Sequence, residues 1–444
     1  MGLVEGALVR YWDTVRETFP GGGLPPLDDR LAGCLSAAAI AVHELPDYRG
    51  TRLRLLDLAR NPEAPSVKSA GALVTVAHAA ARVRATGQPV TLLAPSSGNG
   101  ATALRDAVLR AHRYGLAAPD RLRAVCLVPA RSRYKLRRSP LCEPPLGRRN
   151  PVVVYHGSDP GGVAGLARAY REQYARELRA TYGGALWLVS GRTGDRAAGA
   201  ARALLERDEL PEPGPYGRVH AQAVDSGAGL LGHHDGTLRL PGGHPPPRYL
   251  LVQHLNTPDL VLHALFGSCS RAPMPRYAYD PERRLHRQEA DPRFPGAARS
   301  PDEVLDPTFF TRVPDTASEL SAVVRAGGGG GCVVSAQECL DRYTTVRALL
   351  GAAGIRLPAA PDEVREWALP MALTGVLCAV DRGLLGPGTP EVLVHGTGCA
   401  GVRDSAPLPD SGLRYADSVW ELDTVVAQAL APDSSRAPEA GRAA

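Results

Sequence analysis

Short apolar runs alternate with helical patterns along most of this chain, and this alternation constrains the fold more than any other feature. The runs that read as buried strands cover residues 90–94, 123–129, 151–155, 184–190, 249–253, 332–334 and 392–395. Helical periodicity covers residues 69–86, 101–114, 163–182, 196–207, 317–325 and 418–430. Strands that are separated by helices favour a mostly parallel sheet with helices on both faces, so the predicted class is α/β.

The predicted organisation is two-lobed. Residues 3–18 have the apolar spacing of an amphipathic helix. The predicted N-terminal helical segment spans residues 1–45. The larger lobe comes in two pieces, 46–66 and 211–430, and the smaller lobe spans 67–210. The tail, 431–444, is rich in Pro, Ser, Ala and Arg and is expected to be disordered. The polar, Pro-rich stretch 271–306 has no clear period and is expected to be a flap or an insertion.

Composition excludes several classes of protein. The 444 residues contain no run near ~18 apolar residues, and the start lacks a basic segment followed by an apolar one. A net charge of +5 is too small to indicate a polyanionic partner. The eight cysteines form no Cys-x-x-Cys and no Cys/His cluster with metal-ligand spacing. We therefore expect a cytoplasmic protein with free thiols that binds neither nucleic acid, nor a membrane, nor a metal.

Lysine is nearly absent from the chain. Of 51 basic residues, only Lys68 and Lys135 are lysine. A guanidinium group stays protonated, whereas a desolvated lysine amine can lose its proton and attack a carbonyl to form an imine. Lys68 follows Asn61-Pro62 and precedes the small residues 69–72, which would let a flat ring approach the backbone. The alternative is a solvated lysine at a helix start.

A second segment supports the chemical interpretation of Lys68. Residues 96–100, Ser-Ser-Gly-Asn-Gly, join the strand ending at Ala94 to the next helix. Such a turn presents backbone N–H groups at a helix N-terminus and is suited to an anion such as a carboxylate. The alternative is an ordinary strand-to-helix connection. Together with Lys68, the turn points to a site for pyridoxal 5'-phosphate (PLP).

These motifs resemble those of the fold-type II PLP enzymes, the tryptophan synthase β-subunit superfamily, and within it threonine synthase. The family's lysine segment is similar to residues 61–69, and its Ser-Ser-Gly-Asn loop is similar to residues 96–99. Further similar segments are residues 306–309, 331–338, 354–375 and 392–398. The resemblance spans about residues 50–405, with only the element order matching in the middle third. It implies two lobes, each a mostly parallel sheet flanked by helices, with PLP bound by the larger lobe, and a homodimer.

The resemblance also implies roles for individual residues. Lys68 would form the imine with PLP and then act as the base at the substrate Cα. The substrate carboxylate would be held by Ser96, Ser97, Gly98, Asn99 and Gly100, with Asn99 also reaching the phenolic oxygen of PLP.

Two departures from the family concern the other end of the cofactor. The family's Gly-rich phosphate turn has no counterpart in residues 249–259, so Asn256 and Thr257 are expected to hold the phosphate. His395 falls where a Ser, Thr or Cys usually faces the pyridine nitrogen, with Thr397 nearby. The alternative is that Thr397 takes this role while His395 packs below it.

Two other motifs have simpler interpretations. The run Gly327–Gly331 follows a helix and precedes a strand, which is the wrong polarity for a phosphate cradle, so we expect a flexible connection. The basic cluster at residues 131, 133, 135, 137 and 138 is interpreted as a solvated loop, with binding of a phosphorylated substrate as the alternative.

The predicted function is PLP-dependent β- or γ-elimination or replacement on an amino acid with a leaving group. The departures from the family favour a specialised biosynthetic role, such as making a non-standard amino acid, over ordinary threonine synthesis. A non-catalytic descendant that serves as a binding or scaffold subunit is the main alternative. A nucleotide-dependent transferase ranks last, because the chain has no Gly-x-x-x-x-Gly-Lys-Ser/Thr motif.

Overall fold

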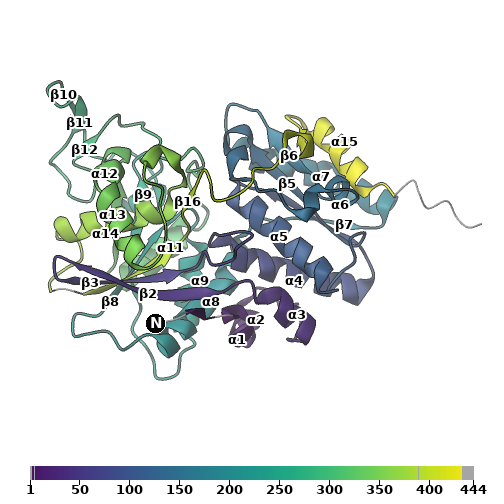
Figure 1. The fold of residues 1–444 in the computed structure, drawn as a ribbon, viewed down its shortest axis with the longest axis horizontal. Helices are drawn as coiled ribbons and strands as arrows, with labels where there is room; N and C mark the ends of the chain where they lie inside the picture. The colour runs from purple at the N-terminus through teal and green to yellow at the C-terminus, as the bar shows by residue number, and fades with distance from the viewer. Residues whose placement is uncertain (1–2, 5, 389, 433–444) are drawn as a thin grey trace, which may run out of the picture.

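Two sheets form the framework of the molecule (Figure 1). The computed structural model describes residues 3–4, 6–388 and 390–432. The larger sheet has the order β1-β2-β3-β15-β8-β9-β13 and the smaller one β17-β6-β5-β4-β7. Each sheet has helices on both faces, so the α/β class and the two-lobed architecture are confirmed.

The larger sheet is parallel from β3 to β13, with β1 and β2 antiparallel at its edge. Its strands are β1 (Leu3–Val4), β2 (Ile40–Tyr48), β3 (Thr51–Asp57), β15 (Glu391–Gly396), β8 (Arg218–Ala223), β9 (Arg248–His254) and β13 (Gly330–Val334). One face is covered by α14 (Ala368–Asp381), with α12 (Ala336–Asp341) and α13 (Tyr343–Ala352) outside it. The other face is covered by α9 (Ala228–Thr237), α10 (Asp259–Phe266) and α11 (Ala317–Ala326). In β9, Leu250 packs toward the first face and Leu251 toward the second, as expected for a sheet that is buried on both sides.

The smaller sheet is entirely parallel. Its strands are β17 (Leu413–Tyr415), β6 (Val152–Tyr155), β5 (Leu122–Pro129), β4 (Val90–Pro95) and β7 (Ala185–Leu188). Helices α4 (Lys68–Thr86) and α5 (Asn99–Arg113) cover one face, and α7 (Gly162–Tyr182) and α15 (Val419–Leu430) cover the other.

Helix α8 (Arg192–Glu209) links the two sheets, because it packs against α4 of the smaller lobe and α9 of the larger one. Glycines allow the close approach: a Cβ on Gly232 of α9 would lie 1.9 Å from the carbonyl oxygen of Arg196 in α8. This contact brings the starts of α4 and α9 to the same region between the lobes.

The remaining elements are short. They are α1 (Ala7–Arg10), α2 (Trp12–Thr18), α3 (Asp29–Leu35), α6 (Leu146–Arg149), and the 3-10 helices η1 (Ala130–Lys135), η2 (Pro140–Cys142), η3 (Pro361–Glu363) and η4 (Asp410–Gly412). Strands β10 (Ala278–Asp280), β11 (Leu285–Arg287) and β12 (Ala297–Ala298) form a three-stranded sheet, and β14 (Val364–Glu366) pairs with β16 (Ala400–Gly401). The stretch 271–306 thus contains the small β10-β11-β12 sheet. Within the described part of the chain, no helix has the length and apolarity needed to cross a bilayer.

All the strands and helices predicted from the alternation are present within a few residues, except that the predicted helix 3–18 is β1, α1 and α2. The hairpin β2–β3, strand β8 and helices α9 and α10 were not predicted. Strand β8 escapes the apolar pattern because Arg218, His220 and Gln222 alternate along it, although all six of its residues are buried.

The predicted lobe boundaries differ from the structure at both ends of the chain. The segment 1–45 includes β1 and the start of β2, so it is not only helical. Residues 413–430 supply β17 and α15 to the smaller lobe, although the prediction assigned them to the larger one. The predicted tail lies outside the described residues from residue 433 onward. The run Gly327–Gly331 connects α11 to β13, as predicted.

Candidate functional site

A pocket between the two lobes is lined by side chains from both lobes. Parallel strands end at the same edge of a sheet, and the loops after those ends commonly form ligand sites. Here the starts of α4, α5 and α9, together with the ends of β8 and β9, line one cavity. The polar side chains that line it include Lys68, Ser97, Asn99, Lys135, Asp195, Arg202, Gln222, Asp225, His254, Thr257, Thr308, Glu366 and Thr397.

Lys68 is the first residue of α4, and its amine lies in this pocket. The lysine Nζ donates to Asp195 Oδ2 of α8 at 2.8 Å. Burial lowers the pKa of Lys68, but the carboxylates of Asp195 and Asp225 outweigh that effect, and the pKa is raised. The amine is therefore held in its charged form here, whereas an attack on a carbonyl requires the neutral form.

The predicted carboxylate turn lies beside Lys68, but its members differ in what they contact. Ser97 and Asn99 line the pocket. Ser96 Oγ accepts from the backbone N–H groups of Gly98 and Ala101 at 3.1 and 2.9 Å, so it caps the start of α5. Gly98 has φ 118°, a backbone conformation that favours glycine. Ser96 and Gly100 line a smaller cavity that also reaches Lys68.

The second lysine of the chain also lines the main pocket. Lys135 Nζ contacts Asp306 at 3.0 Å, Glu366 at 2.7 Å and Thr308 at 2.8 Å, and its side chain is 4% exposed. Burial lowers its pKa, but Glu366 and Asp306 outweigh burial and the pKa of Lys135 is raised. The solvated-loop interpretation is therefore wrong for Lys135, although Arg131, Arg133 and Arg138 are exposed. The rarity of lysine among the basic residues was the signal in the sequence that could have set Lys135 apart from the arginines around it.

A glycine-bearing turn that the sequence interpretation missed joins β8 to α9. Residues 225–229, Asp-Ser-Gly-Ala-Gly, all line the pocket, and Gly227 has φ 68°. The turn precedes a ten-residue helix, so its N–H groups and the helix dipole favour an anion. Strand then helix is the polarity that a phosphate cradle requires.

Arg202 of α8 lies directly against this turn. A Cβ on Gly229 would come within 2.8 Å of Arg202 Nη2, so a larger residue here would require the guanidinium to shift. Arg202 is 4% exposed, and the hydrogen bond found for it among the described residues goes to the neutral Gln222 Oε1 at 3.3 Å. Burial lowers its pKa to about 10. A buried cation without a hydrogen-bonded carboxylate, next to a helix N-terminus, is suited to a bound anion.

The residues expected to hold the phosphate lie one strand further along. Thr257 lines the pocket, but Asn256 is not among the lining residues, and its carbonyl oxygen accepts from Arg271. The sequence analysis looked for the phosphate turn after the strand 249–253 (β9), whereas the Gly-bearing turn of the pocket follows β8. The signal for this turn in the sequence was Gly227-Ala-Gly229, which follows residues 218–223.

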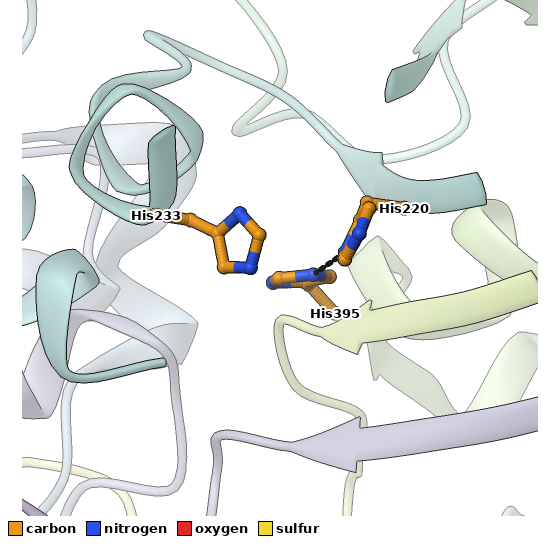
Figure 2. Close-up of side chains that lie close together, drawn as sticks. All are labelled: His220, His233 and His395. Atoms are coloured by element: carbon orange, nitrogen blue, oxygen red, sulfur yellow. Dashed lines mark hydrogen bonds between the residues drawn. The ribbon is translucent and has the colours of Figure 1, made fainter. Parts of the chain in front are cut away.

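Thr397 and His395 lie in different surroundings, which favours the alternative that Thr397, and not His395, faces the pyridine nitrogen. Thr397 lines the pocket, and its buried Oγ1 has no hydrogen-bond partner among the described residues. His395 is not a lining residue; it lies in a cluster with His220 and His233 (Figure 2). Burial and the neighbouring His233 lower the pKa of His395 well below its usual value, and burial lowers that of His220 to about 3. Both imidazoles are therefore uncharged at neutral pH.

The fold is that of the fold-type II PLP-dependent enzymes. The PLP-bound threonine synthase from Brucella melitensis matches 96% of this chain and 85% of its own length, with a TM-score of 0.54 and 11% identity. A PLP-dependent aspartate racemase matches at TM-score 0.48, with 13% identity over 81% of this chain and 89% of its own. An O-acetylserine-dependent cystathionine β-synthase from Helicobacter pylori matches at 0.45, with 16% identity over 86% and 97%.

The chain itself belongs to DUF6002, a family of unknown function, whose model matches residues 9–430. No curated protein matches the sequence. At these identities the similar structures establish the fold alone, and the function has to be argued from the pocket.

Proposed function

We propose that this chain is a PLP-dependent enzyme that acts on an α-amino acid with a leaving group, by elimination or replacement. The observation that carries the proposal is the convergence on one pocket of Lys68, the Asp225–Gly229 turn with Arg202, and the unpartnered hydroxyl of Thr397. These groups match the three ends of the cofactor: an aldehyde, a phosphate and a pyridine nitrogen.

The residues present fit PLP on two independent observations. The turn at Gly229 forms a cradle that a Cβ would fill, and it lies against a buried guanidinium. The Thr397 hydroxyl is buried and unpartnered among the described residues, as expected for a group that binds a ligand. Bound PLP would supply an electron sink for the carbanion formed at the substrate Cα.

Residues of the chain would bind the cofactor, orient the substrate and carry the proton. The backbone N–H groups at the start of α9 and Arg202 would hold the phosphate, and Thr397 would donate to the pyridine nitrogen. Ser97 and Asn99, at the start of α5, would orient the substrate carboxylate. Lys68 would hold the proton that leaves the substrate Cα, since it lines the pocket together with Ser97 and Asn99.

Asp195 has a specific part in this scheme. Its carboxylate pairs with Lys68 at 2.8 Å and keeps the amine charged. Lys68 must release this pair and lose a proton before it can bond to an aldehyde carbon. Asp195 therefore would slow cofactor attachment at neutral pH and would stabilise Lys68 each time the lysine regains a proton.

The same ion pair favours a second candidate function, a PLP-fold protein that binds a ligand without catalysis. If Lys68 stayed charged, the pocket could still hold an anion near the start of α9, but the amine could not bond to an aldehyde carbon. The two functions differ in the covalent step.

An absorbance spectrum with added PLP, followed by an amino-acid panel, tests the proposal. The panel contains serine and homoserine with free, acetylated and phosphorylated hydroxyls, and products are identified by mass spectrometry. We expect a visible band that is lost in Lys68→Ala and kept in the exposed Arg131→Ala, and turnover of at least one panel member. PLP binding without the Lys68-dependent band and without turnover would support the binding protein, and a chain that takes up no PLP would contradict both the enzyme and its cofactor.

A further inference from the structure

Three histidines meet in the interior beside the proposed cofactor pocket. His220 belongs to β8, His233 to α9 and His395 to β15. They are 4%, 1% and 0% exposed. Figure 2 shows the three imidazole rings lying close together, and each offers a nitrogen that lies within 4.8 Å of the others. The sequence gives no metal-ligand spacing, because these residues are 13 and 162 positions apart.

We propose that His220, His233 and His395 bind a transition-metal ion of the zinc type, with Glu206 as the fourth ligand or the partner that orients His233. This site goes beyond the proposed enzymatic function and does not depend on it. Uncharged imidazole nitrogens bind zinc, copper, nickel and cobalt, whereas magnesium and calcium prefer oxygen ligands.

The ring geometry is close to what such an ion requires. Zinc–nitrogen distances of about 2.0–2.1 Å at a tetrahedral angle place two ligand nitrogens roughly 3.3 Å apart. His220 Nδ1 and His395 Nε2 are 3.2 Å apart. The ring centroids are separated by 4.6, 5.1 and 5.5 Å, so the three rings are nearly equidistant. His233 would complete the set by exchanging its contact with Tyr249 for the ion while it keeps its contact with Glu206.

A second observation is the other nitrogen of His395. Its Nδ1 is buried and has no hydrogen-bond partner among the described residues. A buried polar nitrogen without a partner is costly, so the contact with His220 through Nε2 does not by itself satisfy the ring, and a water beside Nδ1 would do so while Nε2 binds the ion. The hydrogen bond between His220 and His395 explains only one nitrogen of each ring.

Glu206 supplies the nearby carboxylate. Its Oε2 lies 2.9 Å from His233 Nε2, and its Oε1 lies 3.7 Å from His220 Nε2. Metal-bound histidines commonly donate their other N–H to a carboxylate, which fixes the ring. Glu206 is itself held by Arg218 at 2.6 Å, and Tyr249 Oη lies 2.7 Å from His233 Nδ1. The cluster thus has both ligands and surrounding groups that hold them.

The position of the cluster suggests a structural ion. His220 and Gln222 are two residues apart on β8 and therefore share a face, and His395 lies near the end of β15, two residues before the pocket residue Thr397. His233 is one helical turn beyond Gly229. A bound ion would therefore tie β8, α9 and β15 together one layer below the pocket. A closed site without an open position is typical of structural zinc.

The test is metal analysis of the purified full chain without PLP, followed by chelator stripping and titration with Co²⁺. We expect about one equivalent of bound metal per chain, and visible Co²⁺ bands of a tetrahedral nitrogen site without the near-ultraviolet band of thiolate ligands. His220→Gln and His395→Gln should each reduce the bound metal to near zero. The exposed His156→Gln is the matched control and should bind as the wild type does.

A thermal melt keeps the test decisive if the variants fold poorly. Zn²⁺ added to the stripped wild type should raise Tm, because a ligand that binds only the folded state stabilises it. The absence of bound metal together with an unchanged Tm would overturn the proposal and leave the cluster a hydrogen-bonded core. Equal Co²⁺ binding by wild type and both variants would overturn it too, by placing the metal elsewhere.

Discussion

At the scale of single residues, the pair between Lys68 and Asp195 governs the chemistry of the pocket. Burial alone would lower the pKa of the amine, and the two carboxylates reverse the sign. A raised lysine pKa means that the neutral amine becomes available only as the pH rises. Scarcity of lysine identified the residue from the sequence, but its partner could not be found, because Asp195 is 127 positions away and one of many acidic residues.

We therefore expect Asp195→Asn to speed covalent attachment of PLP at neutral pH. Without the Asp195 carboxylate, the lowering of the Lys68 pKa by burial is less opposed, so the pKa falls. The rate of PLP attachment then rises at a lower pH than in the wild type. The measurement is the rate at which the visible band appears between pH 6 and pH 10, with the exposed Asp13→Asn as control. Identical profiles for wild type and Asp195→Asn would show that the ion pair does not control the amine.

At the same scale, the proposed function assigns the phosphate to Arg202 and to the turn that contains Gly229. Arg202→Met should weaken PLP binding by about 10- to 100-fold, because a hydrogen bond to a charged group is worth roughly 1.5–3 kcal/mol. Gly229→Ala should have a similar effect by displacing the guanidinium. Gly165→Ala is the matched control, since a Cβ there meets no atom within 4 Å. Equilibrium titration with PLP measures all three, and unchanged affinity in Arg202→Met would exclude this arginine from the cradle.

At the scale of elements, a strand could be predicted from the sequence only where its buried residues are apolar. Strands β4, β5 and β6 were found because their residues are nearly all aliphatic. Strand β8 was missed because its polar side chains are buried and have partners on α8 and β15: Arg218 bonds Glu206 and Glu391, and His220 contacts His395. Missing β8 also moved the predicted phosphate turn to Asn256 and Thr257.

Helix α15 provides an element-scale prediction for stability. Ser418 Oγ accepts from the backbone N–H of Glu421, and the two residues form a capping box at the start of the helix. Ser418→Ala should lower the free energy of unfolding by about 1 kcal/mol, whereas the exposed Gln428→Ala on the same helix should change it little. Chemical denaturation measures both, and equal stabilities would mean that α15 contributes nothing through its cap.

At the scale of the whole molecule, two sheets meet along α8, and the pocket exists only because both contribute to it. The order of elements was enough to predict the α/β class, and the two lobes were expected from the length of the chain and the family resemblance. It was not enough to place β17 and α15 on the smaller sheet, since a strand's partner is set by the path of the chain and not by its own residues. The meeting of three histidines from β8, α9 and β15 is likewise a property of the fold alone.

The presence of only two lysines makes one measurement especially direct. The protein is incubated with PLP, reduced with borohydride and digested, and the modified residue is located by mass spectrometry. The account predicts a phosphopyridoxyl group on Lys68 and none on Lys135, which is held by Asp306 and Glu366. Modification of Lys135 alone, or of neither lysine, would contradict the claim that Lys68 is the reactive amine of this pocket.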